Sequence, residues 1–158
     1  MLQLKSESHG FIIDAPFGAV GFNIQNNNLH GIVLLPFGQP ACAFPGDCAE
    51  LVAGQVKQYL ADPKFKIEAS YVTSGTPFQQ RVWKEIAQIP VGEVRTYADL
   101  ANTLGSGPRA VANACGANRF PLLIPCHRVV AKNGLGGFMQ GKEGGLKIKE
   151  WLLAHESK

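Results

Sequence analysis

Short apolar runs alternate with turn-forming residues in the first half of the chain, a pattern that predicts β-strands. The runs cover residues 11–14, 19–25 and 29–35, are rich in Val, Ile and Phe, and are separated by Pro, Gly and Asn. Three consecutive asparagines at 26–28 predict the tip of a hairpin between the last two strands. These segments predict a small sheet.

A helix and a linker follow the predicted sheet. Asp47 and Glu50 have the spacing of a capping box, and apolar residues then recur at helical intervals up to an Asp-Pro pair. One further strand is expected within residues 64–75. The Thr-Ser-Gly-Thr run that ends this stretch predicts a boundary between a first domain, residues 1–74, and a second domain, residues 75–158.

In the second half of the chain, apolar residues recur at helical intervals. Thr76 and Gln79 repeat the capping-box spacing around Pro77, and proline is favoured in the first helical turn. Four apolar residues then share one face of the predicted helix: Phe78, Val82, Trp83 and Ile86. The second domain is therefore expected to be mostly helical.

Two short helices joined by a glycine-containing turn come next. Thr96 and Asp99 begin the first, Gly105 ends it, and the second runs from Arg109 to about Ala117. This arrangement is typical of a helix-turn-helix, although such pairs also occur as plain packing units. Small residues dominate the second helix and allow close approach to another helix or to a nucleic-acid groove: Ala110, Ala112, Ala114, Cys115, Gly116 and Ala117. Arginines at both ends of this helix favour the groove.

The charge of the chain is unevenly divided. The 158 residues include 15 Lys and Arg and 12 Asp and Glu, a formal net charge of only +3. Residues 1–75 hold 4 basic and 6 acidic side chains, a net −2, whereas residues 76–158 hold 11 and 6, a net +5. All five arginines lie in the second part, which is therefore a candidate nucleic-acid face; ordinary solvated surface charge is the alternative.

Composition also excludes some classes of protein. Apolar residues make up 46% of the chain and charged residues 17%, which excludes a disordered or low-complexity chain. No apolar run approaches the roughly 20 residues that a membrane helix needs. The first residues show no signal-peptide core, so we expect a reducing compartment: the cytoplasm, or the nucleus in a eukaryote.

Cys126 and His127 are the most informative neighbours in the chain. They lie in the apolar run 124–130, which is expected to be strand-like. A free thiol is mostly protonated at neutral pH, and a nearby base or cation is the usual means of forming a reactive thiolate. Because successive strand side chains point to opposite faces, His127 is expected to reach Cys126 through a water or a backbone turn. A buried, inert cysteine is the alternative.

The motif Pro125-Cys126-His127-Arg128, flanked by Ile124 and Val129-Val130, resembles the active-site motif of the O6-alkylguanine-DNA alkyltransferases, also called methylated-DNA-protein-cysteine methyltransferases. The resemblance extends over the whole second half of the chain. Its other matching segments are Thr76-Pro77-Phe78-Gln79, Val82-Trp83, Val91-Gly92-Glu93, Thr96-Tyr97, Arg109-Ala110-Val111, Asn118 and residues 149–156. The first half resembles the family only as a small sheet with a helix.

The resemblance implies DNA repair by direct reversal, in which Cys126 accepts an alkyl group from O6 of guanine and is not regenerated. His127 would be its base, relayed through a water and oriented by Glu156; from the pattern alone, Glu156 would be an exposed helix-terminal acid. Asn118 would tie the recognition helix to the active-site segment, and a helix C-cap is its other interpretation. Tyr97 would supply a proton or hydrogen bond to the leaving guanine.

The resemblance also implies base flipping, because an alkyl group on O6 is unreachable inside the DNA stack. Arg109 would fill the gap from the minor-groove side, and Tyr97 would help to rotate the phosphate. The other expected DNA contacts are Ala110, Ala114 and Cys115. The expected substrate pocket consists of Val129, Phe138 and Cys115. Cys115 is interpreted first as a small apolar filler and second as another reactive thiol.

Some segments depart from the family pattern. The stretch between Tyr97 and Arg109 is about two residues shorter than usual. The glycine-rich loop 134–145, expected to close over the flipped base, is about three residues longer, and Phe138 stands where a tyrosine is common. Arg128 is expected to be structural and to pair with carbonyls or an acid. We expect no cofactor and no metal, because the cysteines lack the Cys-x-x-Cys spacing of structural zinc sites.

These observations predict an α+β fold. A small ribonuclease H-like sheet with one helix would form a scaffold, and a mostly helical domain with the helix-turn-helix would bind DNA and carry the acceptor. The expected partner is double-stranded DNA containing O6-alkylguanine, bound by a monomer, with no membrane involved. Two rival hypotheses are a non-catalytic binder of alkylated DNA with the same fold and an unrelated Cys-His hydrolase.

Overall fold

The structure is a computed structural model that describes residues 11–36, 47–72, 74–137 and 144–157. The chain divides into two compact units, Met1–Thr73 and Ser74–Lys158. The boundary expected between residues 74 and 75 therefore lies one residue from this division. Within the described ranges, no helix combines the length and the apolar character needed to cross a membrane.

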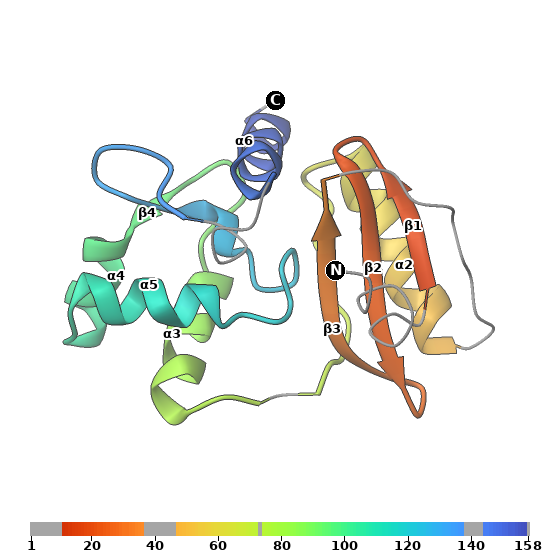
Figure 1. The fold of residues 1–158 in the computed structure, drawn as a ribbon, viewed down its shortest axis with the longest axis horizontal. Helices are drawn as coiled ribbons and strands as arrows, with labels where there is room; N and C mark the ends of the chain where they lie inside the picture. The colour runs from red at the N-terminus through yellow and green to blue at the C-terminus, as the bar shows by residue number, and fades with distance from the viewer. Residues whose placement is uncertain (1–10, 37–46, 73, 138–143, 158) are drawn as a thin grey trace. The chain divides into compact units, whose positions relative to one another are not determined.

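A three-stranded antiparallel sheet forms the first unit, in the order β1 (Phe11–Ala15), β2 (Gly18–Gln25) and β3 (Asn28–Leu35) (Figure 1). The chain turns between β2 and β3 at Asn26 and Asn27, whose φ angles of 53° and 59° suit a type I′ hairpin turn. Asparagine tolerates this left-handed conformation better than most residues. The three predicted strands and the hairpin tip are confirmed.

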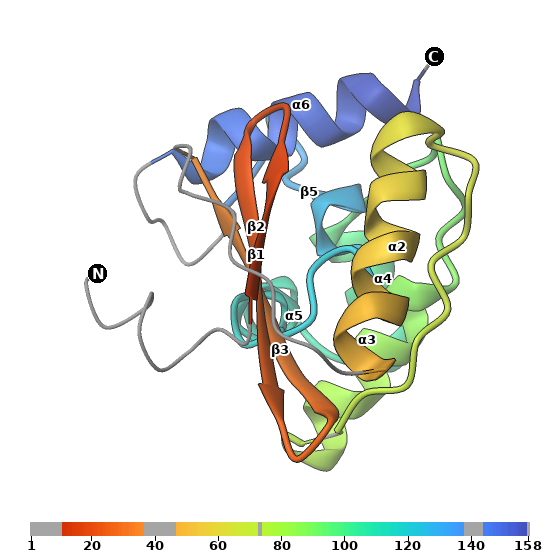
Figure 2. The same cartoon turned by 90° about the vertical axis from the view of Figure 1, so that its right-hand side faces the viewer.

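The helix α2 (Asp47–Ala61) of this unit contacts all three strands and runs along one face of the sheet (Figure 2). The buried apolar side chains of the unit come from both layers, among them Val20 and Phe22 from the sheet and Val52 and Val56 from the helix. The predicted helix is confirmed. Burial of these faces against each other is the main force that can hold so small a sheet together.

The strand expected within residues 64–75 was wrong. Residues 65–72 have no regular secondary structure. One backbone bond joins the Val72 N–H to the Leu29 carbonyl of β3, at 2.9 Å, and the Gln55 side chain bonds both backbone groups of Glu68. At Glu68, the backbone groups thus bond the Gln55 side chain and not a neighbouring strand.

The second unit begins with α3 (Pro77–Ala87), which starts at the predicted capping box. The Thr76 hydroxyl accepts the Gln79 N–H, and the Gln79 side chain accepts the Thr76 N–H. Val82, Trp83 and Ile86 of the predicted stripe are buried. The Trp83 indole N–H donates to the Ala114 carbonyl at 2.8 Å, which fixes the contact between α3 and α5.

The predicted helix pair is present as α4 (Tyr97–Leu104) and α5 (Pro108–Gly116). A second capping box at Thr96 and Asp99 begins α4, and Gly105 ends it with a φ of 67°. The helices α3, α4 and α5 pack against one another. Local signals alone were sufficient to locate both ends of α4.

A short parallel strand pair, a 3-10 turn and a last helix also belong to the described part of the second unit. A 3-10 turn, η1 (Cys126–Arg128), leads into β5 (Val129–Val130), which pairs in parallel with β4 (Arg95–Thr96). The last helix, α6 (Gly145–Glu156), contacts η1. The observed α+β architecture confirms the predicted fold class.

Candidate active site

The segment that carries Cys126 is a double turn and not the expected strand. The Cys126 N–H donates to the Ile124 carbonyl at 2.7 Å across Pro125, whose φ of −76° and ψ of 68° define an inverse γ-turn. The next turn is 3-10, with the Arg128 N–H bonded to the Pro125 carbonyl at 2.9 Å. Extended structure begins only at Val129. The expectation that strand alternation separates Cys126 from His127 was therefore wrong.

Asn118 connects the end of α5 to this double turn. Its side-chain amide donates to the Ile124 carbonyl at 2.9 Å and lies 3.3 Å from the Cys126 sulfur, while its carbonyl oxygen accepts the Phe120 N–H at 2.9 Å. The C-cap of α5 is Ala117, one residue earlier. The side chain of Asn118 therefore ties the helix to the cysteine, as expected, and does not cap the helix.

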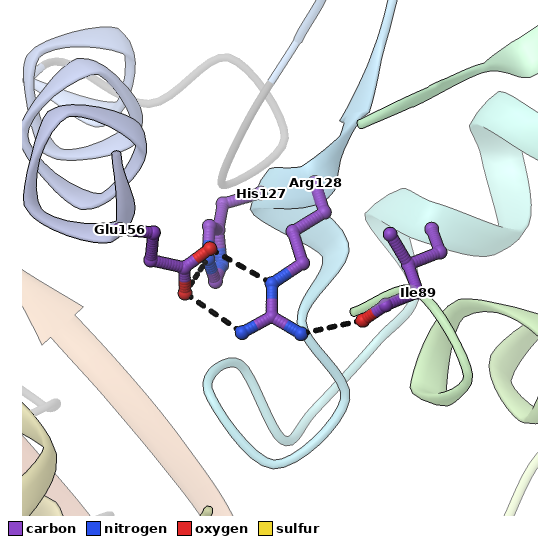
Figure 3. A network of polar contacts seen from close by, with 4 residues as sticks. All are labelled: Ile89, His127, Arg128 and Glu156. Atoms are coloured by element: carbon purple, nitrogen blue, oxygen red, sulfur yellow. Dashed lines mark hydrogen bonds and ion pairs between the residues drawn. The ribbon is translucent and has the colours of Figure 1, made fainter. Parts of the chain in front are cut away.

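Glu156 of α6 is buried beside the 3-10 turn, where its carboxylate binds two side chains (Figure 3). His127 Nε2 lies 2.8 Å from Glu156 Oε2. The Arg128 guanidinium donates through Nε and Nη2 to the two carboxylate oxygens, at 2.8 Å each, and through Nη1 to the Ile89 carbonyl at 2.7 Å. Arg128 thus pairs with both an acid and a carbonyl, as expected. Pattern alone placed Glu156 on the surface, which was wrong.

The His127 ring is kept neutral by its surroundings. Burial lowers the pKa of His127, and the Arg128 and Lys149 cations lower it further, while Glu156 raises it. Because Arg128 already neutralises the carboxylate through two hydrogen bonds, burial is the stronger effect. A neutral ring that donates from Nε2 to Glu156 leaves Nδ1 free of a proton. His127 can therefore act as a proton acceptor.

Cys126 is buried in surroundings that act on its thiol in opposite directions. Burial raises the pKa of Cys126, whereas the Asn118 hydrogen bond and the Lys149 cation lower it. Only 9% of the residue is exposed, so the sulfur is shielded from bulk water. Because burial dominates, this thiol needs a base to remove its proton before it can act as a nucleophile.

Tyr97, at the start of α4, reaches the segment that follows β5. Its hydroxyl oxygen accepts the Gly137 N–H at 3.3 Å. Burial raises the pKa of Tyr97, and the negative charges that Cys115 and Cys126 can carry raise it further. The phenol therefore keeps its proton at neutral pH. Tyr97, Cys115 and Cys126 therefore form one electrostatic neighbourhood, in which the charge of each cysteine acts on the phenol.

Cys115, on α5, belongs to this neighbourhood, because its charge acts on Tyr97. Burial, together with the charge of Cys126, raises the pKa of Cys115 to about 12. A thiol with so high a pKa is almost entirely protonated at neutral pH and is a poor nucleophile. The environment of Cys115 thus agrees with the interpretation of this residue as a small filler.

The remaining predicted site residues have different environments. Arg109 and Ala110 are exposed at the start of α5. Ala114 is only 2% exposed, and its backbone carbonyl accepts the Trp83 indole N–H, so its side chain offers almost no surface for the predicted contact with DNA. Val129 is fully buried in β5. Phe138, predicted for the substrate pocket, lies outside the described residues.

Lys149 of α6 is a residue of this neighbourhood that sequence reasoning did not assign to the site. It is fully buried, and its charge acts on Cys126, Cys115 and His127. The sequence contained an indication that Lys149 is buried, because its helical spacing places it on the same face of α6 as Gly145, Ile148 and Leu152. In the described ranges, no group of three or more His, Cys, Asp or Glu side chains could hold a metal ion.

Comparisons with known proteins agree with this arrangement. The model of the family "6-O-methylguanine DNA methyltransferase, DNA binding domain" matches residues 77–158. A methylated-DNA-protein-cysteine methyltransferase of Candida albicans is 37% identical over 153 residues, which cover 94% of this chain and 85% of that protein.

Two solved structures are similar over nearly the whole chain. An O6-methylguanine methyltransferase of Mycobacterium tuberculosis superposes with a TM-score of 0.78 at 31% identity, covering 94% of this chain and 92% of its own. The OGT protein of the same organism, in complex with DNA, gives a TM-score of 0.77 at 33% identity, covering 92% of this chain and 91% of its own.

Proposed function

The chain belongs to the 6-O-methylguanine DNA methyltransferase family, and we propose that Cys126 is the residue on which it receives the alkyl group. It is a methylated-DNA-protein-cysteine methyltransferase, which repairs DNA by alkyl transfer to its own cysteine, and it binds DNA. The observation that carries the assignment of Cys126 is its place in one hydrogen-bonded turn with His127, whose ring Glu156 holds.

His127 is the base of the proposed reaction. Its neutral ring removes the Cys126 proton through a water molecule, and Glu156 stabilises the cation that forms on the ring. Arg128 has no direct part in this step. Its two hydrogen bonds to Glu156 and one to the Ile89 carbonyl keep the carboxylate ionised and correctly oriented for His127.

The transfer itself is an in-line displacement. The Cys126 sulfur attacks the alkyl carbon, a carbon–sulfur bond forms, and the bond from that carbon to guanine O6 breaks. The electron pair stays on O6, and Tyr97 supplies a proton or hydrogen bond to the leaving base. Because burial raises the pKa of Tyr97, the phenol keeps its proton at neutral pH and is better suited to donate a hydrogen bond to O6 than to transfer the proton. The thioether product is stable, so each molecule repairs one lesion.

In this proposal, the damaged base reaches the site by flipping out of the duplex. The damaged guanine leaves the stack of double-stranded DNA, and Arg109 fills the gap from the minor-groove side. The exposure of Arg109 and Ala110 at the start of α5 supports this contact. Residues 75–158 act as the DNA-binding and acceptor domain, residues 1–74 act as scaffold, and the protein works as a monomer.

Intact-protein mass spectrometry tests the assignment of Cys126. The protein is incubated with a duplex that contains O6-methylguanine, and we expect each molecule to gain one CH2, mapped to Cys126 by peptide analysis. The variant Cys126→Ala should gain nothing, whereas Cys115→Ala should react like the parent protein. Methylation of Cys115 in place of Cys126 would overturn the assignment, and continuing product release without a mass gain would indicate a hydrolase.

A further inference from the structure

Asn113 is an exposed residue in the interior of α5 that the proposed reaction does not use. Its backbone carbonyl accepts the Ala117 N–H at 3.1 Å, but within the described ranges no hydrogen bond involves its side-chain amide. Asparagine is a weak helix former, because its amide competes with the backbone for hydrogen bonds. The stability of α5 therefore does not account for this residue.

Asn113 shares one face of α5 with Arg109 and Ala110. Residues three and four positions apart are neighbours on the surface of a helix, so Asn113 lies one turn beyond both. All three residues are exposed, whereas Val111 and Ala114 of the same helix are buried. The face from which Arg109 is proposed to enter the minor groove therefore continues to Asn113.

The residues around Asn113 are small enough for the backbone of α5 to approach a groove closely. Ala112, Gly116 and Ala117 carry no side chain longer than a methyl group, so the Asn113 amide extends beyond them. At 1.5 Å of helical rise per residue, Asn113 lies about 6 Å along the axis from Arg109. For a helix that follows the groove, this is about two base pairs from the gap that Arg109 fills.

An amide in the minor groove can distinguish two classes of base pair. An A·T pair presents only acceptors there, whereas a G·C pair adds the N2 amino donor of guanine. The Asn113 side chain has both a carbonyl acceptor and amino donors. It can therefore accept a hydrogen bond from guanine N2 and donate one to guanine N3, and this double contact requires the N2 amino group.

We propose that Asn113 recognises the minor-groove amino group of a guanine near the lesion, so that the rate of repair depends on the neighbouring base pairs. The proposal rests on the proposed function, in which α5 enters the minor groove and Cys126 is the acceptor. It goes beyond that function because it gives this chain a preference for a G·C pair at one position close to the damaged base.

The test uses duplexes that differ in one minor-groove amino group. Each duplex contains O6-methylguanine and, within about three base pairs of it on either side, one varied pair: G·C, inosine·C, A·T or 2,6-diaminopurine·T. Inosine lacks the N2 amino group of guanine, and diaminopurine adds this group to adenine. Mass spectrometry measures the second-order rate constant of methyl transfer to Cys126 below saturation, so that DNA binding contributes to the rate.

At one position, the parent protein should repair duplexes that carry the amino group at least about fivefold faster than duplexes that lack it, the lower end for a bidentate contact to a base edge. In Asn113→Ala this dependence should disappear, because a methyl group neither donates nor accepts. The matched control is Asn102→Ala, which removes an exposed asparagine from α4 and should keep the dependence.

Three outcomes would overturn the proposal. The parent rate could ignore the amino group at every position, or Asn113→Ala could keep the dependence of the parent protein. Asn113→Ala could also lose the same factor on every duplex, which would indicate a contact with phosphate or sugar. Because the modified bases also change the shape of the groove, the parent protein and its variants are compared on the same duplexes.

Free O6-benzylguanine separates this proposal from the assignment of the acceptor. Asn113→Ala should fold, since alanine favours a helix more than asparagine does, and should transfer the benzyl group at the parent rate. A slower benzyl transfer in this variant would contradict a role limited to DNA. If the parent protein gains no alkyl group on Cys126, the acceptor assignment fails. If it reacts but ignores the amino group, only the role of Asn113 fails.

Discussion

Gly136 occupies a position in the site where any side chain would collide with Tyr97. Its φ is +76°, a left-handed conformation that most residues avoid. A Cβ built on Gly136 would lie 2.8 Å from the Tyr97 hydroxyl oxygen and 3.1 Å from the Ala131 nitrogen. Both the backbone conformation and the available space therefore require glycine, next to the N–H of Gly137 that bonds Tyr97.

We predict that Gly136→Ala slows alkyl transfer by about tenfold or more, a loss equivalent to about 1.4 kcal/mol of transition-state stabilisation. The new methyl group should displace the Tyr97 phenol, which we propose donates to the leaving base. The left-handed conformation should also cost about 1–2 kcal/mol of folding stability. Single-turnover kinetics with O6-benzylguanine and chemical denaturation measure the two effects.

Gly134→Ala is the matched control, because a Cβ on Gly134 meets no atom within 4 Å. It should leave the rate unchanged. If Gly136 acts through Tyr97, the loss caused by Gly136→Ala should be much smaller in a Tyr97→Phe background than in the parent protein. Equal losses in both backgrounds would show that Gly136 does not act through the phenol.

The helices α4 and α5 illustrate how local and tertiary information combine at the scale of an element. Their limits follow from the capping box at Thr96, the glycine at 105 and Pro108, all of which act within one helical turn. Which face of α5 is exposed depends on α3, whose Trp83 binds the Ala114 carbonyl. The exposed residues Arg109 and Ala110 are therefore better candidates for DNA contact than Ala114.

We predict that Arg109→Ala slows repair of O6-methylguanine in a duplex far more than it slows reaction with free O6-benzylguanine. The proposed flipping role of Arg109 is needed only when the base must leave a stack, which costs a few kcal/mol. Rates of methyl and benzyl transfer, measured side by side, test this. A tenfold or greater loss is expected for the duplex alone.

Lys84→Ala controls for the loss of one positive charge from the same unit, since Lys84 is an exposed residue of α3. Its effect on duplex repair should be small and should vanish at high salt. Equal losses on the duplex and the free base in Arg109→Ala would remove the proposed flipping role.

Stability of the whole molecule is expected to depend on pH through His127. Because burial lowers the pKa of His127 in the folded state, the unfolded chain binds a proton more readily below about pH 6.5. The contribution of the neutral His127 ring to stability is complete above about pH 6.5 and is lost as the pH falls from there toward the lower pKa of the folded state. We predict that the free energy of unfolding decreases by up to about 1.4 kcal/mol per pH unit in this range.

Tryptophan fluorescence during urea unfolding measures this effect in the second unit, because the 2 tryptophans of the chain, Trp83 and Trp151, both lie there. The variant His127→Asn cannot titrate in this range, so its stability should depend less steeply on pH between about 7 and 5. A slope identical to that of the parent protein, or a parent protein that becomes more stable on acidification, would contradict the prediction.

The sequence by itself determined the local features of this protein. The hairpin at Asn26 and Asn27, the capping boxes at Thr76 and Thr96, and the adjacent Cys126 and His127 are signals contained within a few residues. Backbone preferences and short hydrogen bonds act over this range, so a pattern of residue types is enough to predict them. The uneven charge of the two halves was equally visible.

Only the tertiary structure decided which distant groups meet and in what surroundings. Glu156 reaches His127 across 29 residues, and Lys149 reaches the Val129 carbonyl across 20. Without the family resemblance, the pattern favoured a surface position for Glu156, and it gave Lys149 no role. Burial, and the pKa changes that follow from it, depend on every element packed around a side chain. No local pattern contains that information, and the chemistry of this site depends on it.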